Sequence, residues 1–185
     1  MGEPAPTASP LVHRYRLEEF HELAPPPGGG HWELIAGVLY MVPPPTLAHD
    51  TVVSRLNMIF AAYLLSHPER GTLYVPRAAV WIPADTWLEP DLFLVSAERQ
   101  REDDSSAADL VVEVSSTSTA VYDRTAKADT YAALGVGELW LLDMERRTIE
   151  RRVLGGPVSV HRDDEPCTSV VFPGLQATPR QVFGD

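Results

Sequence analysis

Two carboxylates adjoin apolar runs that are typical of buried strands. Asp91 follows Pro90 and opens the run 92–95, and Glu113 lies inside the run 110–114. An ionised carboxylate in a strand buried on both faces is destabilising unless a cation meets it. Hard divalent ions such as Mg²⁺ bind oxygen ligands, usually one or two carboxylates together with substrate phosphate. The pair therefore predicts a divalent-metal site. The competing interpretation is structural: Asp91 caps a loop, and Glu113 pairs with an arginine at the sheet edge.

Lys127 lies four residues after Asp123 and four before Tyr131, so the three share one face of an expected helix. An ammonium group there can orient or activate a water molecule, or stabilise negative charge on a phosphate. The competing interpretation is an exposed ion pair with Asp123, which contributes little to stability.

Two more residues enter the candidate set. Glu33 sits in an otherwise apolar strand, either as a further metal or water ligand or as the outward-facing residue of an alternating pattern. His49, near the start of a long helix, can reach a phosphate or serve as a partly exposed capping or packing residue. The hydroxyl run 115–119 precedes a helix, where such side chains more often cap the helix than bind an anion.

Hydrophobic spacing predicts the elements that must position these residues. The strongest helix covers 47–66, where apolar residues recur every three or four positions after Thr46 as N-cap. A second helix covers 122–134 and ends at Gly135, and a short one covers 16–23. Residues 32–42 predict a hairpin that turns at Ala36-Gly37. Further strands are expected over 72–81, from Asp91 to about 95, around Glu113, and over 138–142, 148–154, 158–161 and 168–172, with a loop over 97–106.

From 47 to 142 the expected order is helix, three strands, helix, strand. The second helix then makes a right-handed crossover between two parallel strands, and the remaining strands can be antiparallel. This pattern predicts an α/β protein with a mixed sheet and helices on its faces. A chain of 185 residues suits one domain, 16–185, after a loose N-terminal tail over 1–15.

The composition restricts the partners and the compartment. A formal net charge of −11 argues against a broad nucleic-acid surface, although a bound divalent ion or the arginine clusters at 14–16 and 146–152 would supply positive charge locally. No apolar run approaches the roughly 18 to 20 residues of a membrane span, and residues 1–10 do not resemble a signal peptide, so we expect a cytoplasmic protein. The single cysteine, Cys167, excludes an internal disulfide and a thiolate zinc cluster, and we expect it in a polar loop.

Several stretches together resemble the Uma-two type of restriction endonuclease, a branch of the PD-(D/E)XK nuclease superfamily. The resemblance covers nearly the whole chain from about Arg16. It is carried by His49 and by the stretches 32–37, 90–92, 110–119, 123–127, 131–136 and 138–143.

The resemblance implies a restriction-endonuclease-like αβββαβ core with an N-terminal hairpin and extra C-terminal strands. It also implies that Asp91, Glu113 and the backbone carbonyl of Val114 hold Mg²⁺ or Mn²⁺. The usual pattern places a lysine two residues after the glutamate, where this chain has Ser115. In the family this lysine is thought to have moved to the following helix, and Lys127 fits that place.

Glu33 matches the family's N-terminal acidic residue, but it falls in a hairpin and not in the first helix of the core. The leading hypothesis is therefore a metal-dependent endonuclease that cleaves nucleic acid, with DNA as the expected substrate and Asp91, Glu113, Lys127 and Glu33 as the catalytic set.

Two other functions stay open at this point. A catalytically silent interaction domain that keeps the nuclease fold predicts that Glu113 contacts an arginine or lysine of its own chain, leaving no open carboxylate pair. A phosphohydrolase acting on small molecules would suit the acidic charge. For assembly we expect a homodimer, formed through exposed C-terminal strands or the apolar region of Trp81, Trp87 and Leu88.

Overall fold

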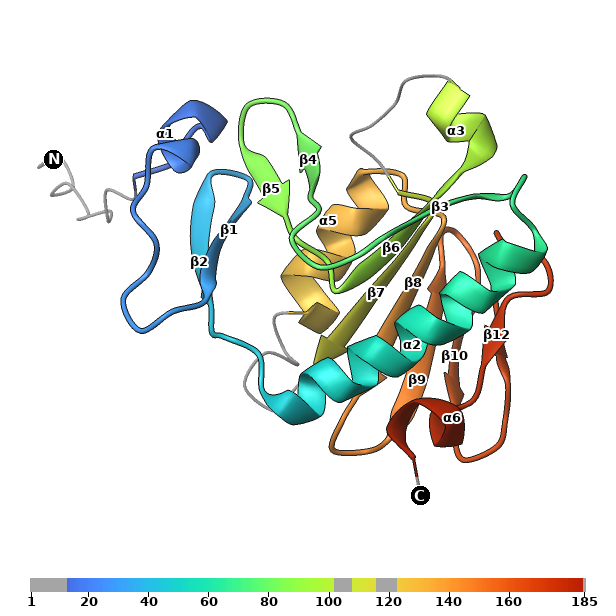
Figure 1. Ribbon diagram of the computed structural model, residues 1–185. Helices are drawn as coiled ribbons and strands as arrows, with labels where there is room; N and C mark the ends of the chain where they lie inside the picture. Colours follow the sequence, from blue (N-terminus) through green and yellow to red (C-terminus); the bar gives the residue numbers. More distant parts are fainter. Residues whose placement is uncertain (1–12, 102–107, 116–122, 185) are drawn as a thin grey trace, which may run out of the picture.

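The computed structural model describes residues 13–101, 108–115 and 123–184 (Figure 1). Its centre is a six-stranded sheet in the order β10-β9-β8-β7-β6-β3. The strands are β3 (Gly71–Tyr74), β6 (Leu92–Ser96), β7 (Leu110–Ser115), β8 (Glu138–Asp143), β9 (Thr148–Val153) and β10 (Val158–His161).

The only parallel pair among these strands is β7 and β8, in the register Glu113↔Leu141. The connection between them contains η1 (Asp123–Lys127), a π-helical turn, and α5 (Ala128–Ala133). The other neighbours in the sheet are antiparallel. The expected mixed α/β architecture with one crossover is therefore confirmed.

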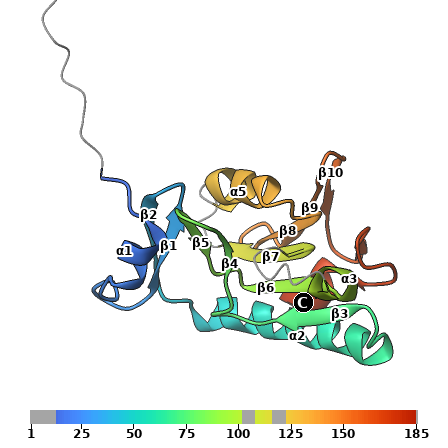
Figure 2. The same cartoon turned by 90° about the horizontal axis from the view of Figure 1, so that it is seen from above.

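One face of the sheet is covered by α2 (Leu47–Ser66), whose bounds match the prediction. Figure 2 shows α2 on one side of the sheet and α5 on the other. The apolar residues of α2 pack against alternate strand residues such as Val112 and Trp140. Thr46 caps the helix, because its hydroxyl accepts a hydrogen bond from the backbone N–H of His49 at 3.2 Å.

The opposite face carries the intervening residues of β7. Val111 packs there with Tyr131 of α5 and with Leu141. Glu113 lies two residues further along the same strand, so its side chain points to the same face. The alternation of β7 therefore directs this carboxylate toward the crossover helix and away from α2.

A second sheet, in the order β2-β1-β5-β4, contains the predicted hairpin of β1 (His31–Ile35) and β2 (Val38–Val42). Ala36 and Gly37 form its two-residue turn, with φ values of 48° and 78°. Arg14 and Tyr15, assigned by sequence to the N-terminal tail, both donate hydrogen bonds to this turn. The short helix α1 (Leu17–His21) precedes the hairpin.

The prediction of a single strand over 72–81 is wrong. The chain leaves β3 at Tyr74 and enters β4 (Val80–Ile82) in the other sheet. Pro76 cannot donate a ladder hydrogen bond, and Arg77 has a left-handed φ of 78°, so the strand cannot continue. β4 pairs with β5 (Thr86–Leu88), which the sequence analysis did not identify.

Trp81 and Trp87 stack across these strands with ring centroids 5.7 Å apart. Leu88 is fully buried and therefore cannot form part of a dimer surface.

The C-terminal segment also differs from the prediction. Residues expected as a strand over 168–172 form only the short β11 (Cys167–Thr168), which pairs with β12 (Gln176–Ala177) before α6 (Pro179–Phe183). The backbone N–H groups of Val170 and Val171 donate to the buried carboxylate of Glu138 instead of to a strand ladder. Cys167 is fully buried in the core and not in a polar loop.

The charged segment after β6 begins with a helix, α3 (Ala97–Arg101), where a loop was expected. The rest of that segment and most of the hydroxyl run 115–119 lie outside the described residues. Within the described ranges, no helix is both long and apolar enough to cross a membrane.

Candidate active site

The two candidate carboxylates come from neighbouring antiparallel strands. The pairing Leu92↔Val112 places Asp91, just before β6, opposite Glu113 in β7. The carboxylate Oδ2 of Asp91 also accepts a hydrogen bond from the backbone N–H of Val114 at 2.7 Å. The sheet register therefore fixes the relative position of the pair.

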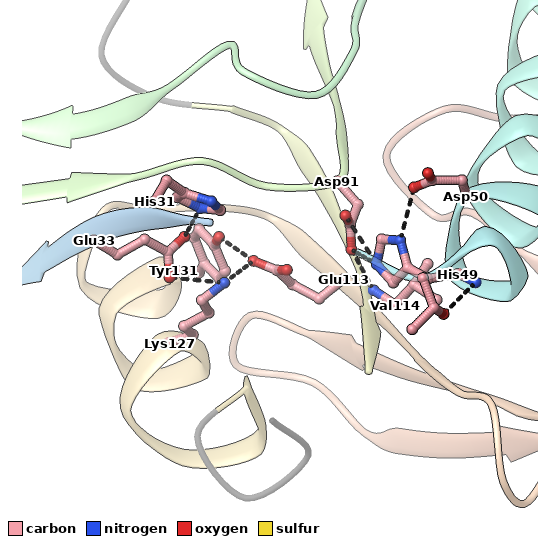
Figure 3. Close-up of polar contacts among 10 residues, drawn as sticks. His31, Glu33, His49, Asp50, Asp91, Glu113, Val114, Lys127 and Tyr131 are labelled. Carbon is pink, nitrogen blue, oxygen red and sulfur yellow. Dashed lines mark hydrogen bonds and ion pairs between the residues drawn. The ribbon is translucent and has the colours of Figure 1, made fainter. Parts of the chain in front are cut away.

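Glu113 is buried and meets two side chains from the crossover helix (Figure 3). Its Oε1 atom lies 3.1 Å from the ammonium nitrogen of Lys127 and accepts a hydrogen bond from the Tyr131 hydroxyl at 2.5 Å. Lys127 closes η1 and Tyr131 follows one turn later in α5, so both reach the same carboxylate. The alternative interpretation of an exposed lysine does not hold, because the Lys127 side chain is only 4% exposed.

Glu33 is completely buried in β1 and contacts the same lysine. Its Oε2 atom lies 3.0 Å from the Lys127 ammonium, and its Oε1 atom accepts a hydrogen bond from the backbone N–H of Glu89 at 3.1 Å. Burial alone would raise the pKa of Glu33, but the charge of Lys127 and the hydrogen bonds outweigh it and hold the pKa below its ordinary value of 4.5. One ammonium group thus bridges two buried carboxylates.

His49 approaches Asp91 from the first turn of α2. Its Nε2 atom lies 3.2 Å from Asp91 Oδ1, and its Nδ1 atom lies 3.4 Å from Asp50 Oδ1. Partial burial lowers the pKa of His49, but the hydrogen bonds and charges of Asp91 and Asp50 outweigh it and raise the pKa above 6.5. The imidazole therefore contacts a carboxylate of the site, whereas the sequence left open a phosphate contact or a capping or packing role.

In Figure 3 the two carboxylates turn to opposite sides, Asp91 toward His49 and Val114, and Glu113 toward Lys127 and Tyr131. Both nevertheless line one cavity of about 460 Å³, together with His49, Val114 and Lys127. Glu33 does not line the cavity and is connected to it through Lys127. The structure thus brings all five sequence-derived candidates into one connected site.

The donor atoms suit a hard divalent ion. Among the described residues, no group of three or more His, Cys, Asp or Glu side chains is arranged to hold a metal. The cavity is instead lined by Asp91, Glu113 and Val114, which carry two carboxylates and a backbone carbonyl as possible oxygen donors. Mg²⁺ is commonly bound by one or two carboxylates, with water and substrate phosphate completing its shell. The residues therefore fit the metal that the resemblance implies.

Ser115 occupies the position where the usual motif has its lysine. It is buried, and its hydroxyl has no hydrogen-bond partner among the described residues. Lys127 reaches Glu113 from the helix instead. The structure thus shows a lysine beside the motif glutamate, although the lysine comes from a different element.

Sequence reasoning assigned no role to three residues of this region. Tyr131 had a visible signal, because it lies four residues after Lys127 on one helix face. Glu89 and Arg77 had none. Glu89 meets Glu33 because β1 pairs with β5, and Arg77 lies 3.0 Å from Glu89 because the chain turns back between β3 and β4.

The sequence model of the Uma2 family, described as "Putative restriction endonuclease", matches residues 17–180. Among solved structures, the chain is similar to one described as a putative nuclease belonging to DUF820 from Anabaena variabilis ATCC 29413. That structure has a TM-score of 0.74 and 18% sequence identity, and the match covers 91% of this chain and 97% of the other.

No curated protein matches the sequence. The similarity to the solved structure confirms the nuclease fold, and the family model spans almost the whole chain. This protein therefore belongs to the Uma2 family, as the sequence motifs predicted.

Proposed function

We propose that this protein is a metal-dependent endonuclease that hydrolyses phosphodiester bonds in nucleic acid, with DNA as the expected substrate. The observation that supports this most strongly is that Asp91, Glu113 and Lys127, which come from three separate parts of the chain, line the same cavity. Membership of the Uma2 family, described as "Putative restriction endonuclease", also supports a nuclease function. Two oxygen-donor side chains and one buried ammonium group are what metal-assisted phosphoryl chemistry requires.

Asp91, Glu113 and the carbonyl of Val114 would hold Mg²⁺ or Mn²⁺. When bound, such an ion polarises a phosphate and lowers the pKa of an attacking water molecule. The ammonium of Lys127 orients that water or offsets the negative charge that develops on the phosphate. Its contact with Glu113, at 3.1 Å, would keep the ammonium beside a phosphate bound between the two carboxylates.

Glu33 and His49 act through other residues in this proposal. Glu33 contacts Lys127 from outside the cavity lining and fixes the position of its ammonium. His49 contacts Asp91 in the cavity wall and restricts the rotation of that carboxylate. Both are therefore positioning residues.

Two alternatives each have one supporting observation. The ion pair between Lys127 and Glu113 is the contact that a silent interaction domain predicts, although the nuclease hypothesis requires the same proximity. A cavity of about 460 Å³ also has the size of a site for a small phosphorylated molecule.

A cleavage assay with matched variants separates these functions. Labelled DNA, labelled RNA and a panel of nucleotides are incubated with Mg²⁺ or Mn²⁺ and with wild type, Asp91→Asn, Glu113→Gln or Glu145→Gln. Glu145 is an exposed carboxylate outside the cavity and serves as the control. Cleavage should fall by about 100-fold or more in the two site variants and remain at the wild-type rate in the control.

Polymer cleavage that persists in Asp91→Asn or Glu113→Gln would refute the site assignment. Hydrolysis of nucleotides without polymer cleavage would favour the phosphohydrolase. Absence of any hydrolysis by a folded wild type would favour the interaction domain.

A further inference from the structure

The hydroxyl of Tyr131 is a part of this side chain that apolar packing does not need. The residue is only 1% exposed, and its ring packs with Val111 and Leu141 on the face of the sheet that α5 covers (Figure 2). A phenylalanine ring would make the same apolar contacts. A buried hydroxyl is costly unless a hydrogen bond satisfies it. Any role that is specific to tyrosine here therefore lies with the partner of the hydroxyl.

That partner is Glu113. The hydroxyl donates to Oε1 of this carboxylate at 2.5 Å, a distance typical of hydrogen bonds from a hydroxyl to an ionised acceptor. Lys127 donates to the same oxygen at 3.1 Å, and Figure 3 shows both donors beside it. A carboxylate oxygen has two lone pairs, so these donors occupy both acceptor positions of Oε1. A metal ion held by Glu113 would therefore be coordinated by Oε2.

The hydroxyl constrains this carboxylate more than the ammonium does. The ammonium of Lys127 also lies 3.0 Å from Oε2 of Glu33 and has three rotatable donors, so it does not fix the plane of the Glu113 carboxylate by itself. The terminal torsion angle of a glutamate is otherwise broad and roughly two-fold, which would let its two oxygens exchange places. The ring of Tyr131 is held by its packing, so its hydroxyl selects one oxygen as acceptor and opposes that exchange.

Tyr131 reaches Glu113 from outside the cavity. Glu113 and Lys127 line the cavity of about 460 Å³, and Tyr131 does not. Tyr131 follows Lys127 by four residues, so both side chains lie on one face of the crossover helix and meet the carboxylate together. The hydroxyl would therefore act on a bound ion only through Glu113.

We propose that Tyr131 is a positioning residue of the metal site: its hydroxyl holds Oε1 of Glu113 and thereby presents Oε2 to the ion. This inference rests on the proposed metal-dependent function of the cavity and adds to it a residue that does not line the cavity. Hydrogen-bond partners of metal ligands typically contribute about 10–100-fold to metal affinity. Loss of this hydroxyl should therefore weaken metal binding although both carboxylates remain.

The first test is a calorimetric titration of Mn²⁺, with and without an oligonucleotide, into wild type, Tyr131→Phe and Tyr63→Phe. Tyr63 is the matched control, because it is also a buried tyrosine, its hydroxyl donates to the backbone carbonyl of Pro173 at 3.2 Å, and it does not line the cavity. Tyr131→Phe should bind Mn²⁺ at least about tenfold more weakly, and the control should match the wild type.

Equal or tighter binding by Tyr131→Phe would overturn this inference and leave the metal site intact. If the wild type binds no Mn²⁺ under either condition, the proposed metal site fails, and this inference fails with it.

The second test separates positioning of Glu113 from a general effect on packing. In the Glu113→Gln background, the further change Tyr131→Phe should leave the residual Mn²⁺ affinity unchanged within about twofold, because the hydroxyl acts through the carboxylate that is already removed. Denaturant unfolding of the same proteins without metal confirms that each is folded. A further tenfold loss in the double variant would show that Tyr131 acts by another route and would overturn the assignment.

Discussion

Lys127 stands between two buried carboxylates, and its ammonium lies within hydrogen-bond distance of both Glu33 and Glu113. Each carboxylate alone would be costly to bury in ionised form. Because the lysine is also nearly inaccessible to solvent, the three charges depend on one another and not on water. The residue proposed to assist catalysis is therefore also a structural residue.

Replacing Lys127 by methionine should destabilise the protein by about 3–5 kcal/mol at neutral pH, because it leaves two buried carboxylates without their cation. The free energy of unfolding would be measured by denaturant titration. The double variant Lys127→Met with Glu33→Gln removes one of the two buried negative charges and should recover part of the lost unfolding free energy. A loss below about 1 kcal/mol in the single variant would contradict the buried-network interpretation.

The same network predicts a pH dependence. The pKa of Glu33 in the folded protein is below 4.5, so its contribution to stability is present above pH 4.5 and is lost as the pH falls through the folded-state pKa. In Lys127→Met burial still raises the pKa of Glu33, and the charge of Lys127 no longer opposes it, although the hydrogen bonds from His31 and from the backbone N–H of Glu89 still lower this pKa. The difference in unfolding free energy between wild type and variant should therefore shrink on acidification. An unchanged difference across the acidic range would exclude Glu33 as the cause.

The site residues were predictable to different extents. Asp91 and Glu113 are recognisable because a carboxylate beside or inside an apolar strand is rare and conspicuous. The contact of Glu33 with Lys127 was not predictable, because it depends on how the hairpin packs beside the crossover helix. Arg77 gave no signal, because its place at the cavity follows from a turn that the sequence analysis read as a continuous strand.

At the scale of elements, α2 places His49 beside Asp91, and the N-cap Thr46 stabilises the first turn of this helix. Thr46→Ala removes the hydrogen bond to the backbone N–H of His49 and should lower the unfolding free energy by about 1 kcal/mol. Thr46→Ser keeps a hydroxyl and should stay close to the wild type. Denaturant titration of both variants measures the cap. Equal losses in the two variants would show that the hydroxyl is not what stabilises this turn.

The hairpin that carries Glu33 depends on Gly37. Its φ is +78°, and a Cβ atom there would lie 3.0 Å from the Cβ of Arg14. Gly135 has a similar φ of +75°, but a Cβ atom there would meet nothing within 4 Å. Gly135→Ala should therefore cost only the left-handed strain of about 1–2 kcal/mol, and Gly37→Ala should cost more because of the added contact. A smaller loss for Gly37→Ala, measured by thermal or denaturant unfolding, would contradict this packing.

Local pattern was sufficient for some elements and not for others. The bounds of α2 were predicted to the residue because its apolar spacing is regular over five turns and a cap marks its start. The hairpin turn at Ala36-Gly37 was equally clear. The prediction of a strand over 168–172 was wrong, because the backbone N–H of Val170 donates to the Glu138 carboxylate and not to a neighbouring strand. This acceptor lies more than thirty residues away in sequence, so the local pattern did not indicate it.

At the scale of the whole molecule, we expect the affinity for DNA to depend only weakly on salt. The net charge is negative, and the arginine and lysine among the described residues that line the cavity are Arg77 and Lys127. Single-stranded DNA loses binding with a slope of about −0.7 in log K against log salt for each neutralised phosphate. With Arg77 and Lys127 as the contacts, the slope should be shallower than about −2. The binding of a labelled strand to Glu113→Gln, which should not cleave it, would be measured across salt concentrations. A slope as steep as that of a protein with 6–10 phosphate contacts, roughly −4 or beyond, would reveal a broad cationic surface.

The expected homodimer stays a prediction, and sedimentation of the full chain would test it. The apolar region named for it is reduced to Trp81 and Trp87, because Leu88 is part of the core. The edge strand β10 retains Val158 and Val160 as exposed apolar residues that a second chain could cover. A dimer through this edge would leave the cavity accessible, since no β10 residue lines it.

The measurement that tests the central claim most directly is a calorimetric titration with Mn²⁺, made with and without a single-stranded oligonucleotide to supply phosphate. Wild type and Glu145→Gln should bind the ion equally well. Asp91→Asn and Glu113→Gln should bind it at least about tenfold more weakly, because each removes one of two carboxylate ligands. Equal binding by all four proteins, or no binding by the wild type under either condition, would contradict a metal site at Asp91 and Glu113.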